Sequence, residues 1–180
     1  MCGIVGAVAE RNVTELLLEG LRRLEYRGYD SAGMAVISET AELHRLRRMG
    51  KVSELTAAQK EYALSGTTGI AHTRWATHGQ PSESNAHPHQ SSERLAVVHN
   101  GIIENYEELR EQLRAKGYQF ESETDTETIV HLIHDNLQHT DLLTAVQNSV
   151  KALDGAYAIA VIDSQNPDKI IACRKGSPLV

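Results

Sequence analysis

The feature that most restricts the fold of this sequence is an apolar run over residues 156–162, Ala-Tyr-Ala-Ile-Ala-Val-Ile, in which polar residues do not alternate with apolar ones. Successive side chains of a β-strand point to opposite faces of its sheet, so a strand that is apolar throughout needs cover on both faces. Two stacked sheets with helices outside them would provide that cover. The chain has 180 residues, which is enough for one domain with a full core.

The spacing of apolar residues divides the rest of the chain into strands and helices. Short runs bounded by turn residues predict strands over 3–9, 32–37, 42–48, 68–72, 95–99 and 169–173, the first of them buried. Helical spacing predicts helices over 12–27, 51–60, 105–116, 124–137 and 143–153. The apolar faces of the first and last helix are predicted to include Leu16 and Leu143. Asn12, Asn105 and Thr124 each precede a Glu by three residues, which is typical of a capping box.

Two segments lack such a period. Residues 74–92 hold Gly, Pro, Ser, Asn and His, and predict a long loop, which in a compact domain is usually functional or disordered. The chain stops at Gly-Ser-Pro-Leu-Val, inside what the pattern indicates is a new apolar strand. We therefore expect a domain that is truncated at its C-terminus.

The net charge and the cysteine content indicate which partners and which cellular compartment to expect. The net charge of −6 argues against a nucleic-acid or anionic-membrane binder, which would carry a basic face. Two cysteines, Cys2 and Cys173, do not make a disulfide framework, so a reducing, cytoplasmic compartment is expected. The sequence predicts neither a secretory signal nor a membrane span, since no basic region precedes the apolar start and no apolar run approaches about 18 residues.

Cys2 becomes the first residue if Met1 is removed, which a small second residue favours. It would then carry a thiol and a free α-amine. A thiol pKa of about 8.5 leaves only a minor ionised fraction at neutral pH, and an adjacent α-amine with a pKa of about 7.7–8.0 can take the proton and later return it. On its own, a cysteine in second place is more often a small buried residue.

Five motifs in a fixed order identify a family. They are Met1-Cys-Gly-Ile-Val-Gly6, Tyr26-Arg-Gly-Tyr-Asp-Ser-Ala-Gly33, His72-Thr-Arg-Trp-Ala-Thr-His-Gly79, His99-Asn-Gly-Ile-Ile-Glu-Asn105 and Ser122-Glu-Thr-Asp-Thr-Glu127. Over essentially the whole chain the sequence resembles the N-terminal-nucleophile class of glutamine amidotransferases, and within it the glucosamine-6-phosphate synthase branch. The phosphoribosyl and asparagine synthetase branches share the Cys start and an Arg-Gly-x-Asp element, but the second and third motifs match them less well.

The resemblance implies an α+β fold, the four-layer αββα sandwich of two stacked antiparallel sheets. Residues 1–180 would form one glutaminase domain, incomplete at its C-terminus and without the sugar-phosphate isomerase domain. The implied reaction converts glutamine and water to glutamate and ammonia through a γ-glutamyl thioester on Cys2.

The oxyanion formed in such a reaction needs hydrogen-bond donors, each of which costs roughly 3–4 kcal/mol when removed. The resemblance assigns this role to the Asn100 side-chain amide and the Gly101 backbone N–H. From the residues alone, Asn-Gly after a strand predicts a tight turn, either one that presents an N–H to a substrate or an ordinary hairpin turn.

Glutamine also carries an α-carboxylate and an α-ammonium group. Arg74 suits the carboxylate, because its guanidinium can bind it through two hydrogen bonds. Asp125 suits the ammonium, its alternative role being to stabilise the first turn of a helix. Both match the family pattern, which also places Thr77 and His78 along the pocket.

Three further residues receive supporting roles from the resemblance. Trp75, the only tryptophan, would gate the route of ammonia, and its alternative role is to anchor a long loop by packing. Arg27 and Tyr29 would support the Cys2 amine and the loop.

No cofactor is implied, and no metal site is expected. The histidine pairs His87-x-His89 and His131-x-x-His134 lack a Cys or acidic partner at a recognised zinc spacing. The implied partners are L-glutamine and, in a full-length enzyme that forms dimers, a sugar-isomerase domain that binds fructose-6-phosphate. Two alternatives stay open. One is an amidotransferase with a different acceptor, and the other is a fragment that binds glutamine or a partner without turnover, because core strands are missing or Met1 is retained.

Overall fold

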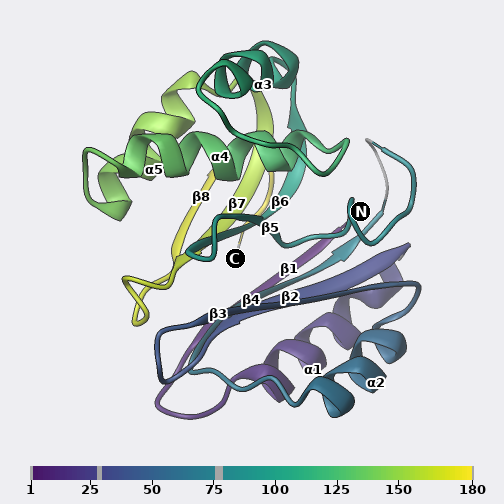
Figure 1. Ribbon diagram of the computed structural model, residues 1–180. Coiled ribbons are helices and arrows are strands. Elements are labelled where there is room, and N and C mark those ends of the chain that lie inside the picture. Colours follow the sequence, from purple (N-terminus) through teal and green to yellow (C-terminus); the bar gives the residue numbers. More distant parts are fainter. Residues whose placement is uncertain (1, 28–29, 76–78, 180) are drawn as a thin grey trace.

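The computed structural model describes residues 2–27, 30–75 and 79–179. Two four-stranded antiparallel sheets are stacked on one another, with helices on both outer faces (Figure 1). The strand order in the first sheet is β1 (Gly3–Val8), β4 (Thr68–Arg74), β2 (Ser31–Ile37), β3 (Leu43–Met49). In the second sheet it is β5 (His89–Ser91), β6 (Leu95–Ile103), β7 (Gly155–Asp163), β8 (Ile171–Lys175).

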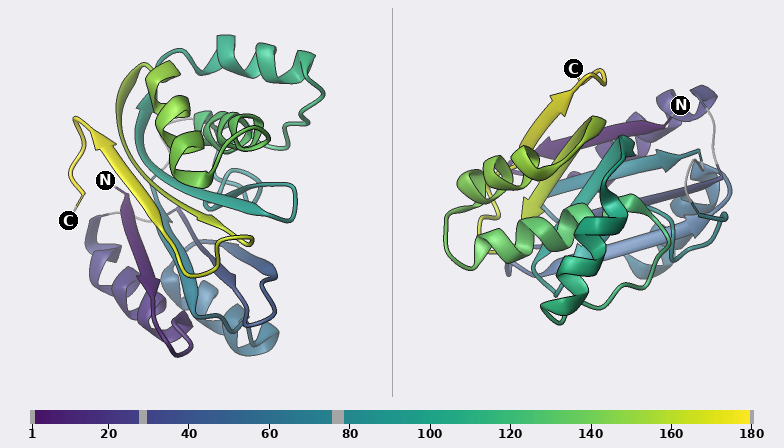
Figure 2. Two further views of the ribbon diagram at one scale, coloured as in Figure 1. Left: turned by 90° about the vertical axis from the view of Figure 1, so that its left-hand side faces the viewer. Right: turned by 90° about the horizontal axis from the view of Figure 1, so that it is seen from above.

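The helices complete a four-layer sandwich, as Figure 2 shows from two further sides. The first sheet is covered by α1 (Thr14–Leu24) and α2 (Val52–Tyr62), and a short 3-10 helix, η1 (Glu25–Arg27), follows α1. The second sheet is covered by α4 (Asp125–Leu137) and α5 (Leu142–Ala152), and α3 (Tyr106–Ala115) packs against α4. The predicted α+β fold with αββα layers is therefore confirmed.

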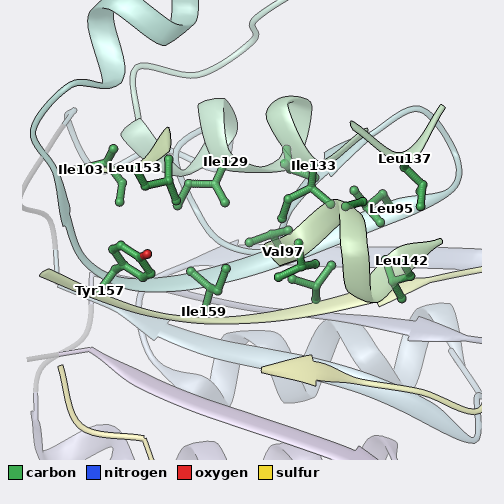
Figure 3. Packing of buried hydrophobic residues seen from close by; sticks show 14 of the residues in the cluster. Leu95, Val97, Ile103, Ile129, Ile133, Leu137, Leu142, Leu153, Tyr157 and Ile159 are labelled. Atoms are coloured by element: carbon green, nitrogen blue, oxygen red, sulfur yellow. The ribbon is translucent and has the colours of Figure 1, made fainter. Parts of the chain in front are cut away.

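Strand β7 shows why the apolar run needed cover on both faces. Tyr157, Ile159 and Val161 point toward α4 and α5, where they join the apolar cluster of Figure 3. Ala160 and Ile162 lie between the two sheets. All five side chains are buried, so the absence of polar residues follows from the position of the strand in the middle of the second sheet.

The predicted helices are present, but in the first and last of them the buried residues differ from those predicted. Leu16 is 46% exposed and Leu143 is 50% exposed, whereas Leu18 and Leu142 are buried. Helix α1 buries Thr14, Leu17, Leu18 and Leu21, which have the i, i+3, i+4, i+7 spacing of one helix face. The prediction that Leu16 and Leu143 are buried was wrong, because a run of adjacent leucines does not reveal which of them faces the sheet.

Three predictions about turns and strand ends were also wrong. Asn100 and Gly101 do not form a tight turn, since both lie inside β6 and pair with β7 opposite Ala158 and Tyr157. The segment 74–92 is not all loop, because it contributes β5 to the second sheet. The first strand is only partly buried, since β1 is an edge strand and Val8 is 48% exposed.

Asn105 and Thr124 precede helices as predicted, but neither side chain caps its helix. Asn105 instead donates to Ala152 O and accepts from the Asp154 N–H, at 2.8 and 3.0 Å. The structure places 177–179 outside any strand, in contrast to the predicted apolar strand there. None of the described helices has the length and apolar character needed to cross a membrane.

Candidate active site

A cavity of about 370 Å³ lies where the start of β1, the end of β4, the second half of β6 and the first turn of α4 meet. Its lining includes all the predicted site residues that the structure describes in full, from four separate parts of the sequence. The lining residues are Cys2, His72, Arg74, Trp75, His87, His99, Asn100, Gly101, Ile102, Thr124, Asp125, Thr126, Ser177 and Pro178.

Cys2 precedes β1 and is held beside the residue that follows β4. The Trp75 backbone N–H donates a hydrogen bond to Cys2 Sγ at 3.1 Å, and the Trp75 carbonyl oxygen lies 3.6 Å from the same sulfur. Burial raises the pKa of the Cys2 thiol, and the Trp75 N–H offsets this only in part. The thiol is therefore protonated at neutral pH, and it needs a base before it can act as a nucleophile.

Asn100 and Gly101 reach the cavity because β6 continues past the predicted end of its strand. Asn100 Nδ2 donates to the Cys2 carbonyl oxygen at 3.3 Å. Gly101 has a φ of +131°, and a Cβ there would lie 2.0 Å from the Ala156 carbonyl oxygen. Only glycine fits this backbone, which places an exposed peptide group next to the asparagine amide.

Arg74 brings a buried cation to the cavity at the end of β4. It is 4% exposed, its Nη1 lies 3.5 Å from Asp30 Oδ1, and its Nη2 donates to Gly79 O at 3.3 Å. A buried guanidinium in such a position can bind a carboxylate. Asp30 was not predicted as a site residue, although its position inside the second motif was a signal for it.

Asp125 begins α4, as the sequence predicted. Its Oδ2 accepts from the Ile103 backbone N–H at 2.8 Å, and its Oδ1 lies 3.8 Å from His99 Nδ1. The carboxylate thus ties the first turn of α4 to the end of β6. It faces the same cavity as the guanidinium, so the two bring opposite charges to one space.

Three buried histidines in the lining were not predicted as site residues. Burial lowers the pKa of His72 to about 3 and that of His87 well below its usual value, so both rings are neutral at physiological pH. His72 and His99 each open one of the motifs, which was a signal for them. His87 lies in the segment predicted as a loop, and nothing in the sequence indicated its burial.

Some predicted residues cannot be placed. Tyr29, Thr77 and His78 lie outside the described residues, and so does the side chain of Arg27, the last residue of η1. Trp75 is 57% exposed at the cavity edge. Among the described residues, no group of three or more His, Cys, Asp or Glu side chains is arranged to hold a metal ion.

Comparisons with known proteins agree with this arrangement. The family model described as a glutamine amidotransferase domain matches residues 72–177. Glutamine–fructose-6-phosphate aminotransferases [isomerizing] of Pseudomonas putida and Pseudomonas syringae pv. tomato are 63% and 64% identical over 181 positions, which cover 100% of this chain and 30% of each relative. The chain thus spans about a third of the length of these relatives.

A solved structure shares the fold. Glutamine phosphoribosylpyrophosphate amidotransferase from B. subtilis, complexed with ADP and GMP, superposes with a TM-score of 0.77 and 27% identity. The match covers 91% of this chain and 35% of that one.

Proposed function

Because this chain belongs to the glutamine amidotransferase domain family, we propose that it hydrolyses the side-chain amide of glutamine to glutamate and ammonia through a thioester on Cys2. One observation carries the proposal: the Cys2 thiol, the Asn100 amide, the Gly101 backbone and the charges of Arg74 and Asp125 share one cavity. These are the groups that a thioester route from glutamine requires.

The reaction begins with transfer of the Cys2 thiol proton to the α-amine of the same residue. The sulfur attacks the amide carbon, and the Asn100 Nδ2–H and Gly101 N–H stabilise the oxyanion. The ammonium returns the proton to the leaving nitrogen, which departs as ammonia. The amine then takes a proton from water, whose oxygen attacks the thioester, and the thiol is regenerated as glutamate leaves. The route requires removal of Met1, since an acylated nitrogen cannot act as the base.

Recognition of glutamine follows from its two charged groups. Arg74 binds the α-carboxylate and Asp125 the α-ammonium, with Thr77 and His78 along the same pocket. Trp75, exposed at the cavity edge, gates the exit of ammonia, and Arg27 and Tyr29 support the Cys2 amine and the loop after β4.

In a longer parent protein, the ammonia passes to a second domain that converts fructose-6-phosphate to glucosamine-6-phosphate. The support is the identity of 61–64% to glutamine–fructose-6-phosphate aminotransferases, against 27% to the phosphoribosylpyrophosphate enzyme. We place the parent enzyme in the cytoplasm as a dimer.

The first prediction is that ammonia release tracks the fraction of chains with a free Cys2 amine. Intact-mass measurement on the same samples as a glutamine-dependent ammonia assay would establish this relation. Cys2→Ala should abolish release, because the thioester cannot form. Cys173→Ala is the matched control, since Cys173 packs against the second sheet's core outside the cavity. Full activity in chains that retain Met1 would contradict the role of the amine.

A further inference from the structure

The side chain of Asn100 lies between two hydrogen-bond partners, one that accepts a hydrogen bond from it and one that donates a hydrogen bond to it. Its Nδ2 lies 3.3 Å from the Cys2 carbonyl oxygen, and its Oδ1 lies 2.8 Å from His72 Nε2. A carbonyl oxygen only accepts hydrogen bonds, so the Asn100 group that faces Cys2 must be the NH₂. Asn100 Oδ1 then faces His72 and needs a donor, which places the imidazole proton on Nε2 of His72.

From this geometry we propose that His72 is a positioning residue, whose Nε2–H fixes the Asn100 carboxamide with its NH₂ toward Cys2 and the oxyanion. The inference rests on the proposed function. An asparagine amide rotated by 180° has almost the same shape but exchanges oxygen for nitrogen. In the rotated form, Oδ1 would face the Cys2 carbonyl and the oxyanion, and the NH₂ would face the N–H of His72. To accept from that NH₂, His72 would have to carry its proton on Nδ1, which is buried and has no hydrogen-bond partner among the described residues. The imidazole therefore disfavours the inactive orientation.

A second ring fixes the plane of the first. The rings of His72 and His87 are stacked, with centroids 4.2 Å apart and an angle of 23° between their planes. The His99 backbone N–H donates to His87 Nδ1 at 3.3 Å, so the proton of the neutral His87 ring is on Nε2, which lies 3.2 Å from Thr126 Oγ1. The Thr126 hydroxyl lies 2.9 Å from His99 Nδ1. These contacts link the strand just before Asn100 to the first turn of α4.

The surroundings keep His72 in a single protonation state. It is 1% exposed, and burial lowers its pKa to about 3. The nearby charges of His99 and Arg74 also lower the pKa, whereas hydrogen bonds to the Asn100 side chain and the His99 backbone raise it without outweighing burial. The ring thus stays neutral across the physiological pH range, with Nε2–H as its only donor, which a histidine near its usual pKa of about 6.5 would not ensure.

The test compares kcat and KM for ammonia release in protein with a free Cys2. His72→Leu should lower kcat about 10- to 100-fold, part of the loss from removing an oxyanion donor, with little change in KM, since Arg74 and Asp125 are intact. His72→Gln, which still offers an N–H, should recover most of kcat. His134→Leu is the control, because this half-buried imidazole also bonds to one hydroxyl, that of Ser91, but lies outside the cavity. A His72→Leu enzyme with unchanged kcat would overturn the proposal.

A double-mutant comparison separates positioning from general damage. If His72 acts through Asn100, His72→Leu should cause no further loss of kcat in an Asn100→Ala background. Independent losses that multiply would overturn the proposal.

A measurement without substitutions covers the case in which His72→Leu does not fold. The ¹⁵N shifts of the His72 ring should show a protonated Nε2 and an unprotonated Nδ1 from pH 5 to 8. A proton on Nδ1 together with an unprotonated Nε2 would overturn the proposal. The proposed function is tested independently of His72: it is wrong if unsubstituted protein with a free Cys2 releases no ammonia.

Discussion

At the residue scale, Gly101 combines a backbone conformation and a close approach that exclude other residues. Its φ of +131° lies in the region that favours glycine, and the Ala156 carbonyl oxygen occupies the space where a Cβ would be. This affects catalysis as well as stability, since a shift of β6 away from β7 would move the Gly101 N–H relative to Cys2.

Gly101→Ala should therefore both destabilise the fold and lower kcat for ammonia release, because the clash is with backbone on a paired strand. Gly117→Ala is the matched control: Gly117 also has a positive φ, +96°, but nothing lies within 4 Å of a Cβ there. Urea unfolding and ammonia release should be measured for both variants. Gly117→Ala reports the cost of the positive φ alone, and any additional loss in Gly101→Ala reports the clash with Ala156. Equal losses of stability and of kcat in the two variants would contradict the role of the close contact between Gly101 and Ala156.

At the scale of elements, the start of α4 is held by an acid that does not cap its own helix. Glu127 Oε2 accepts hydrogen bonds from the Ser122 N–H at 2.7 Å and the Ser122 hydroxyl at 2.6 Å, and Oε1 accepts from the Glu121 N–H at 2.9 Å. Burial alone would raise the pKa of Glu127, but these hydrogen bonds and the nearby His131 side chain outweigh it and hold the pKa at about 2. The segment before Asp125 is thereby fastened to the helix.

Glu127→Gln should lower the free energy of unfolding by about 2 kcal/mol, because hydrogen bonds to a charged acceptor contribute more than those to an amide. It should also raise KM for glutamine, since Asp125 begins the same helix. Chemical unfolding and steady-state kinetics would measure the two effects. Glu108→Gln on the exposed face of α3 serves as control, and an equal effect there would refute the anchoring role.

At the scale of the whole molecule, the buried histidines make stability depend on pH. Burial lowers the pKa of His72, His87 and His89 well below the value of about 6.5 expected in the unfolded chain. The unfolded state therefore takes up protons as the pH falls below about 6.5, while the folded state does not. Their contribution to stability is complete above about pH 6.5 and is lost as the pH falls toward about 3.

The urea midpoint should accordingly fall between pH 7.5 and pH 5.5. A variant with His87→Gln and His89→Gln should show a shallower fall, whatever its absolute stability. Equal midpoints for the unsubstituted protein at the two pH values would contradict the neutral state of these rings.

The sequence by itself determined the order and type of most elements and the family. The uninterrupted apolar run of β7 required cover on both faces, and the motifs named Cys2, Arg74, Asn100, Gly101 and Asp125, which line one cavity. These features are local, since they depend on spacing along the chain and on the chemistry of each side chain.

Only the tertiary structure decided which faces are buried and which residues surround the reacting groups. The pairing of β6 with β7 converted a predicted turn at 100–101 into strand, because cross-strand hydrogen bonds override a local turn preference. The contacts of His72 with Asn100, and of His87 with His72, join residues 28 and 15 positions apart in sequence. No local pattern encodes such contacts, since they exist only once β4, β6 and the segment before β5 are packed together.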